Sequence, residues 1–252
     1  MTTDTTEFWL PGDVNRPTCD RAMRADWTDA INDAVRTLED LDAAERAYSI
    51  EIEVVERSPR QGISLVESCE YVLGMLLHAE REGGKRGYTA RRLAQIHGTL
   101  RAAQNDSGVR LRIRTEPALT LQPAGMLLVD LECDFAAIAS RRSTRRSTHI
   151  DWMRSFRNTL EQNNLARAGV EYAITIDLPL EPGPVGRETA IGSAIRFIGQ
   201  IATTLPNKPH QKSTLLELWL NLLPLPDGPA PPLHLRVWRL GYMKIPSQTR
   251  TA

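Results

Sequence analysis

Residues 170–180, VEYAITIDLPL, place an apolar side chain at every second position over the length of a strand. The apolar side chains that share this face are Val170, Tyr172, Ile174, Ile176, Leu178 and Leu180. Such alternation is typical of a β-strand with one face buried and the other in contact with water. It favours a largely antiparallel sheet covered on one side over a doubly wound parallel sheet, whose strands are apolar on both faces.

The same alternation on both sides of this segment predicts further strands. Tyr48–Val55 and Val109–Thr115 follow the pattern closely. Ala118–Ile138 is interrupted by a proline and a glycine, so it predicts either two strands or one strand with a bulge. Two apolar segments near the C-terminus, Leu215–Leu223 and Leu233–Ile245, complete a predicted sheet of about six or seven strands.

Between these strands, apolar residues recur at intervals of three and four, which predicts amphipathic helices. The predicted helices span Arg24–Arg46, Ser64–Arg81, Ala90–Gln104, His149–Arg167 and Arg187–Thr204. Strands and helices together predict an α+β fold, a mostly antiparallel sheet with four or five helices packed mainly on one face.

The domain organisation follows from the ends of the chain. Turn-forming residues crowd the first two dozen positions, which predicts an irregular arm over residues 1–24. A single domain is then expected over residues 25–246, with a short tail at residues 247–252. We expect no internal repeat of fixed period.

Composition excludes several classes of protein. The 252 residues are 41% hydrophobic and 25% charged, which is ordinary for a globular protein and excludes a disordered, collagenous or disulfide-scaffold chain. Three widely spaced cysteines predict neither disulfides nor a zinc site. No secretory signal and no apolar stretch of about 20 residues is present. We therefore expect a cytoplasmic protein without a transmembrane segment; the nucleus of a host cell and peripheral membrane contact stay open.

Charge is balanced overall but segregated along the chain. There are 31 basic and 31 acidic residues, and all but four of the basic residues are arginines. Residues 26–56 contain ten acidic residues and two arginines, whereas residues 81–114 contain nine basic and two acidic residues. Two interpretations stay open: a basic face that attracts polyanions, or neutralisation of the arginines by the acidic first helix through surface ion pairs. The arginine bias itself fits either function or GC-rich coding.

Two arginine patterns are the candidate binding residues. Arg110, Arg112 and Arg114 lie at alternate positions of a predicted strand, so their guanidinium groups would project from one face about 6.5 to 7 Å apart, close to the spacing of phosphates. A doubled RRST unit at residues 141–148 supplies four more arginines beside hydroxyl groups. These arginines are Arg141, Arg142, Arg145 and Arg146. A solvated sheet face and a solvated helix entry are the simpler interpretations of the two patterns.

No catalytic, cofactor or metal motif is present, so we expect no cofactor, no metal and no assigned catalytic residue. His149 follows the RRST unit and is a candidate general base for RNA cleavage, with Tyr242 or Lys244 as a partner. No carboxylate is placed on its helix to orient it, since Asp151 falls on another face. A cap or surface histidine is the simpler interpretation.

The order of elements in the middle of the chain is similar to the ferredoxin-like repeat proteins of CRISPR systems, some of which cleave RNA with a histidine. Their glycine-rich C-terminal loop is absent here, where Gly241 stands alone. The layout and segregated charge also look like matrix or assembly proteins of viruses. These are likenesses of element order alone.

The leading hypothesis is a non-enzymatic binding or assembly protein, either virus matrix-like or a ribonucleoprotein component. Its arginine-rich face would contact RNA or another polyanion, and it would self-associate. The first alternative is a metal-independent, RNA-processing endoribonuclease of the ferredoxin-like type. The second is a protein–protein adaptor.

Overall fold

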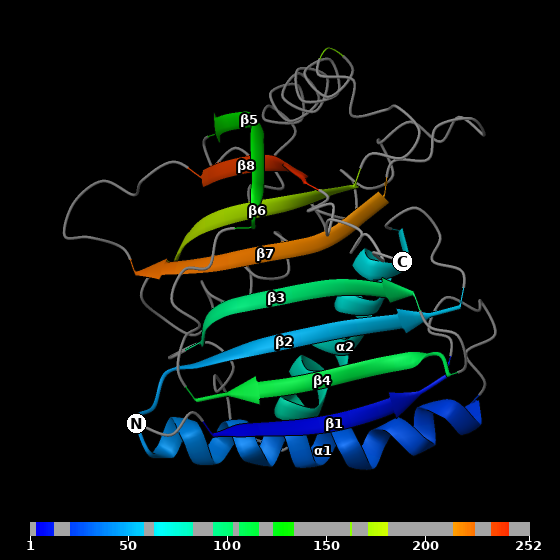
Figure 1. Cartoon of the computed structure of the whole chain (residues 1–252). Coiled ribbons are helices and arrows are strands. Elements are labelled where there is room, and N and C mark those ends of the chain that lie inside the picture. Colours follow the sequence, from blue (N-terminus) through cyan, green and yellow to red (C-terminus); the bar gives the residue numbers. More distant parts are fainter. Residues whose placement is uncertain are drawn as a thin grey trace, which may run out of the picture.

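A computed structural model of the chain describes residues 4–12, 21–57, 63–82, 93–102, 106–115, 123–133, 162, 171–180, 214–224 and 233–241. Within these residues, eight strands form one mixed sheet in the order β1-β4-β2-β3-β7-β6-β8-β5 (Figure 1). The strands are β1 (Thr5–Pro11), β2 (Tyr48–Glu56), β3 (Leu93–Ala102), β4 (Gly108–Arg114), β5 (Gly125–Cys133), β6 (Glu171–Leu180), β7 (Thr214–Pro224) and β8 (Leu233–Leu240).

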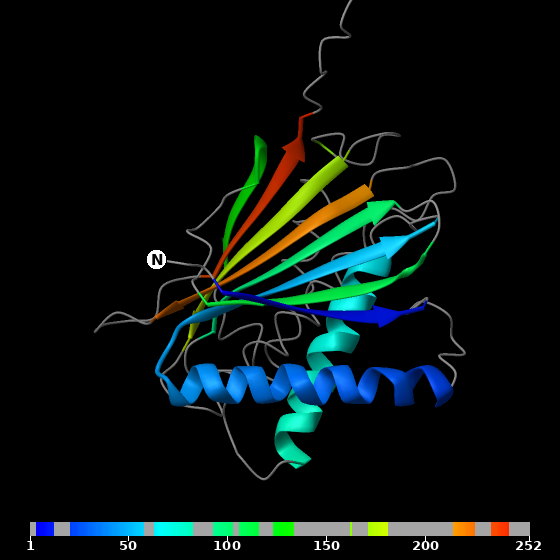
Figure 2. The same ribbon diagram turned by 60° about the horizontal axis from the view of Figure 1, so that its bottom comes forward.

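Two helices, α1 (Arg21–Ala43) and α2 (Ile63–Glu82), lie on the same side of the sheet (Figure 2). Their apolar faces pack on the alternate apolar side chains of the strands, such as Ile50 and Ile52 of β2, which are fully buried. Trp27 of α1 contacts both β1 and α2. Its indole nitrogen donates to the carbonyl of Pro11 in β1 over 2.9 Å, and its ring meets Tyr71 of α2 edge to face. The core therefore occupies one face of the sheet and leaves the other face to polar residues.

The predicted fold class is wrong. The sheet has eight strands rather than six or seven, and it is mixed because β2 pairs with β3 and β6 pairs with β7 in parallel. The described residues contain two helices instead of four or five, and strands predominate among them. The segments predicted as helices at residues 149–167 and 187–204 lie outside the described residues, apart from position 162.

The third predicted helix, Ala90–Gln104, is instead the strand β3. Its apolar residues Leu93, Ile96 and Leu100 have helical spacing, but Ile96 and Leu100 are also separated by an even number of residues and so share one face of a strand. Between them lies Gly98, where a Cβ atom would stand 2.8 Å from the Cys69 sulfur of α2. The close approach of α2 to the sheet at this glycine is a tertiary feature that local periodicity does not reveal.

The N-terminal segment predicted as an irregular arm contains a strand. Thr5–Pro11 forms β1, the edge strand that pairs antiparallel with β4. Leu10 is fully buried, whereas Trp9 is 39% exposed. The prolines and glycine that suggested an arm stand at or beyond the end of this strand rather than within it.

The sheet consists of two halves with the same strand pattern, which corrects the expectation of no internal repeat. In the N-terminal half the order is β1-β4-β2-β3, and in the C-terminal half β5-β8-β6-β7, counted from the outer edge inward. In each half the outer two pairings are antiparallel and the inner one is parallel. The inner strands β3 and β7 join the halves antiparallel, as two units related by a pseudo-twofold axis would be.

Individual residues repeat this relation. Tyr48 and Tyr172, 124 positions apart, are both buried at the start of a strand, and each is followed at once by a register shift. Glu53 and Arg112 form an ion pair in the N-terminal half, and Asp177 and Arg236, each 124 positions further on, form one in the C-terminal half. The period is long and few identities mark it, so the repeat becomes visible only through strand pairing.

Candidate polyanion-binding face

We call the sheet face opposite α1 and α2 the polar face. One register row crosses all eight strands on this face, so that each residue is paired with the next across neighbouring strands. In strand order the row is Glu7, Arg112, Glu51, His97, Trp219, Thr175, Arg236 and Asp130. Polar side chains from distant parts of the sequence are thereby fixed side by side.

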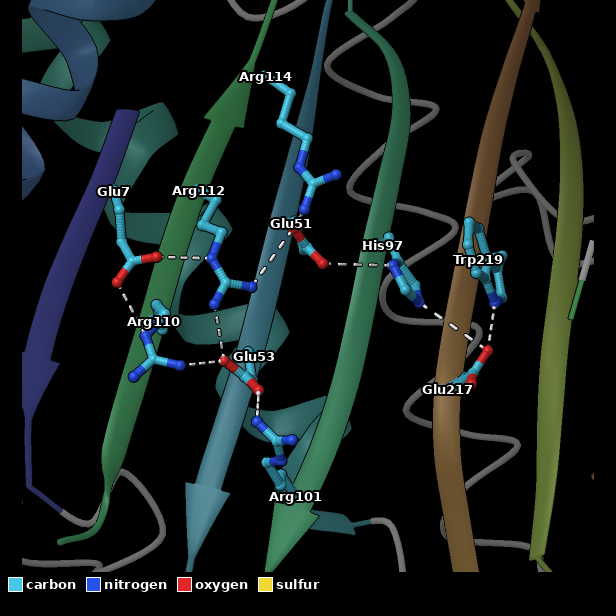
Figure 3. A network of polar contacts seen from close by, with 10 residues as sticks. All are labelled: Glu7, Glu51, Glu53, His97, Arg101, Arg110, Arg112, Arg114, Glu217 and Trp219. Carbon is cyan, nitrogen blue, oxygen red and sulfur yellow. Dashed lines mark hydrogen bonds and ion pairs between the residues drawn. The ribbon is translucent and has the colours of Figure 1, made fainter. Parts of the chain in front are cut away.

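Glu53 of β2 is the centre of the ion pairs in the N-terminal half (Figure 3). One of its carboxylate oxygens accepts from Arg101 at 3.2 Å, and the other from Arg110 at 2.5 Å and Arg112 at 3.2 Å. Its side chain is only 9% exposed. Three guanidinium groups from two neighbouring strands thus converge on one buried carboxylate, in charge-assisted hydrogen bonds.

Glu7 and Glu51 extend this network to both sides. Glu7 of β1 contacts Arg110 at 3.0 Å and Arg112 at 2.7 Å. The hydrogen bond from Arg112 lowers the pKa of the Glu7 carboxyl. Glu51 of β2 contacts Arg112 at 3.5 Å and Arg114 at 2.7 Å. Arg112 therefore touches all three carboxylates and is the most constrained of the arginines.

The three arginines of the predicted stripe do lie on one face of β4, but they do not project freely. Arg110, Arg112 and Arg114 bend toward carboxylates of β1 and β2. Of the two interpretations of the segregated charge, neutralisation accounts for part of this region. The neutralising groups come from neighbouring strands, however, and not from the acidic first helix.

The charged groups are layered by depth. The carboxylate side chains of Glu51 and Glu53 are 18% and 9% exposed, whereas Arg101, Arg110 and Arg114 are 70%, 30% and 40% exposed. We call these three guanidinium groups the arginine layer. Glu7, at the sheet edge, is the one exposed carboxylate of the network. This network on the polar face thus contains four arginines and three carboxylates, and most of its exposed charge is positive.

Sequence reasoning missed two residues of this region, Arg101 and Trp9. Arg101 lay in the segment predicted as a helix, and Trp9 in the predicted arm. Trp9 faces the polar side, where the guanidinium carbon of Arg110 lies 5.6 Å from its ring centroid. Alternation of Glu7 and Trp9 with the more buried Phe8 and Leu10 was the signal that could have identified this strand.

The centre of the polar face holds a stacked pair of rings on β3 and β7. The rings of His97 and Trp219 stack with centroids 3.6 Å apart, and the two imidazole nitrogens lie 4.0 Å from carboxylates of Glu51 and Glu217. Burial, together with the charge of Arg114, lowers the pKa of His97 to about 4. A neutral His97 separates the charged network of the N-terminal half from that of the C-terminal half.

In the C-terminal half a hydrogen-bond chain crosses four strands. Arg236 donates to Asp177, which accepts a second bond from the Asn221 amide at 2.7 Å. Asn221 in turn accepts from the buried Gln95 of β3 at 2.6 Å. Arg236 is the only arginine in this chain of hydrogen bonds. On the neighbouring strand β5, the acidic side chains of Asp130 and Glu132 are 52% and 66% exposed. Among the described residues, the exposed charge on the polar face of β5, β6 and β8 is therefore mainly negative.

The remaining predicted site residues lie outside the described part of the chain. These are the four RRST arginines, Arg141, Arg142, Arg145 and Arg146, and the candidate catalytic group His149 with Tyr242 and Lys244. In the described segments, no cluster of three or more histidine, cysteine or acidic side chains is arranged to hold a metal ion. Neither described helix is long and apolar enough to cross a bilayer. Cys69 is a free, buried thiol.

Comparison with known proteins does not assign this chain to a family. No family model matches the chain, and neither a curated protein nor a solved structure matches it.

Proposed function

We propose that this chain is a non-enzymatic binding protein whose arginine layer contacts the phosphates of RNA or of another polyanion. The observation that carries the proposal is the layering of charge in the N-terminal half. Arg101, Arg110 and Arg114 are more exposed than the carboxylates of Glu51 and Glu53 that they contact, which hold them from beneath.

Ion pairing of this kind both opposes and assists phosphate binding. The carboxylates reduce the positive potential, so the layer is weaker than three free arginines. They also fix the guanidinium groups in position, and an ordered side chain loses less conformational entropy when a ligand binds. A guanidinium group has more N–H donors than the one or two carboxylate contacts that each arginine of the layer makes, so the remaining N–H groups are available to phosphate oxygens.

Charge alone specifies a polyanion and not a sequence. Guanidinium contacts to a phosphate backbone position a nucleic acid without reading its bases. Cytoplasmic RNA is the ligand that fits the proposal best, and the nucleus of a host cell is the other location consistent with it. A role in assembly would follow if several copies line the same polyanion.

The alternative of a ferredoxin-like endoribonuclease gains no support from the order of elements in the N-terminal half. A ferredoxin-like unit has the order β-α-β-β-α-β. The N-terminal half here runs β1-α1-β2-α2-β3-β4, with a parallel inner pair. The binding hypothesis therefore takes precedence over RNA cleavage by His149.

The proposal is tested by binding of fluorescent RNA and of heparin at low and moderate salt. Replacing Arg101, Arg110 and Arg114 together with glutamine should weaken binding of both polyanions at least tenfold at low salt, because about three phosphate contacts are lost. The matched control replaces Arg36, Arg46 and Arg239, which lie outside the arginine layer, with glutamine. Equal losses in both triple variants would contradict the proposal. Absence of any polyanion binding by the wild type would leave the protein–protein adaptor as the better hypothesis.

A further inference from the structure

We propose that Trp9 is a stacking platform for the bases of a single-stranded nucleic acid, beside the phosphate contacts of the arginine layer. This inference rests on the proposed function and names the class of polyanion. It starts from an exposed aromatic ring at the edge of the sheet, in direct contact with a guanidinium group of the arginine layer.

The structure holds the Trp9 ring in place. Gly108 of β4 makes room for it, because a Cβ atom at Gly108 would lie 2.5 Å from the indole ring. Arg110 lies against the ring at 5.6 Å, in the range of a cation–π contact. The indole nevertheless remains 39% exposed. A ring fixed by its neighbours and still accessible can stack with a base at little cost in side-chain order.

Two guanidinium groups of the arginine layer lie beyond this ring on the same face of the sheet. Trp9 pairs with Arg110, and Arg110 pairs with Glu53, whose carboxylate also holds Arg101. Arg101 stands two positions beyond Thr99, the β3 partner of Glu53, so its backbone is displaced from that of Arg110 by about 10 Å across the sheet and by about 7 Å along the strands. A strand of nucleic acid running obliquely across the sheet would therefore meet an aromatic ring first and two guanidinium groups after it.

Stacking on Trp9 selects single strands over duplexes. The faces of bases inside a duplex are already covered by their neighbours, whereas unpaired bases offer a free face to an aromatic side chain. An aromatic ring beside a basic groove is the arrangement that sequence-tolerant single-strand binders use. Heparin and polyphosphate carry negative charge but no bases. Their binding therefore separates the contribution of charge from the contribution of base stacking.

The experiment compares Trp9→Ala, Trp9→Phe and Met126→Ala. Met126 is the matched control, an exposed apolar residue on the opposite edge strand. Trp9→Ala should weaken binding of a short oligoadenylate RNA by about 5- to 150-fold, the range expected for one base stack. It should change heparin affinity less than twofold. Trp9→Phe should retain most of the RNA affinity, and Met126→Ala should resemble the wild type for both ligands.

Fluorescence provides a measurement that does not depend on the alanine variant folding. Quenching of tryptophan emission by the oligoadenylate should be clear in the wild type and reduced in Trp9→Phe, which retains the other four tryptophans. Equal losses of RNA and heparin affinity in Trp9→Ala, or unchanged quenching in Trp9→Phe, would overturn the stacking role while the arginine layer stands. If the wild type binds neither RNA nor heparin, the proposed function itself fails and stacking fails with it.

Discussion

The two halves of the sheet share a framework and differ in what they expose. Each has a buried tyrosine near the start of β2 or of its equivalent β6, and one arginine–carboxylate pair at equivalent positions, Arg112 with Glu53 and Arg236 with Asp177. The shared residues are those that fix the pairing of strands. These two ion pairs therefore belong to the structure that the halves share. The candidate site lies where the halves differ.

The differences concentrate at the outer positions. Where the N-terminal half pairs Trp9 with Arg110, the C-terminal half pairs Glu132 with His234 in the equivalent row. An exposed aromatic–arginine pair in one half thus corresponds to a carboxylate–imidazole pair in the other. Only the first arrangement suits a nucleic acid, because a carboxylate repels phosphate and offers no ring for stacking.

The largest expected effect concerns the two equivalent ion pairs. Arg236→Met should destabilise the protein by about 3 kcal/mol, because it leaves the largely buried Asp177 without its cation. Arg112→Met should cost about 1 kcal/mol, since Arg101 and Arg110 still neutralise Glu53. Urea unfolding followed by circular dichroism measures both. Equal losses would show that the N-terminal network is not redundant.

A smaller effect is expected from pH, through His97. Its pKa is about 4 in the folded protein and about 6.5 when unfolded, so below pH 6.5 the unfolded chain takes up a proton that the folded chain does not. Stability is therefore lost as pH falls from about 6.5 toward 4, by about 2 kcal/mol between pH 7.5 and pH 5.

His97→Phe should flatten this part of the stability profile. The carboxylates of Glu51 and Glu217 and the guanidinium of Arg114 face the same ring, so the comparison is made against the wild type at each pH. An identical pH dependence in the variant would show that His97 is not the group responsible.

A third prediction compares two glycines of the N-terminal half. Gly98→Ala should cost about 1 to 2 kcal/mol, because the new Cβ would press on the sulfur of Cys69. Gly74→Ala, on α2, meets no atom within 4 Å and should stabilise the protein by up to about 1 kcal/mol. Thermal unfolding of the two variants checks the contrast. A harmless Gly98→Ala would mean that α2 lies further from β3 than the structure places it.

The smallest expected effect is a gain of binding. Glu7→Gln releases Arg110 and Arg112 from one carboxylate and should strengthen RNA binding about fivefold at low salt, a change of about 1 kcal/mol. Asp130→Asn removes the same charge at the equivalent position of the C-terminal half and serves as the control. Fluorescence anisotropy with labelled RNA measures both. Equal gains would indicate a general effect of net charge.

Strands with a strict alternation could be predicted from sequence, and the rest required tertiary information. Tyr48–Val55 and Val170–Leu180 were located to within about one residue, because one face of each is apolar throughout. The strand β3 was missed because its spacing also fits a helix, and the parallel pairings depend on crossovers between distant segments. For the candidate site, alternation placed three arginines on one face. Their carboxylate partners on β1 and β2 could be found only from strand register.

The most direct test of the arginine layer is the slope of log K against log salt concentration for binding of single-stranded RNA. Each lost phosphate contact reduces the slope by roughly 0.7 for a single strand. Replacing Arg101, Arg110 and Arg114 with glutamine should therefore flatten the slope by about 2, while the same change at Arg36, Arg46 and Arg239 should leave it nearly unchanged. An unchanged slope in a folded Arg101, Arg110 and Arg114 variant would contradict phosphate binding by the N-terminal half.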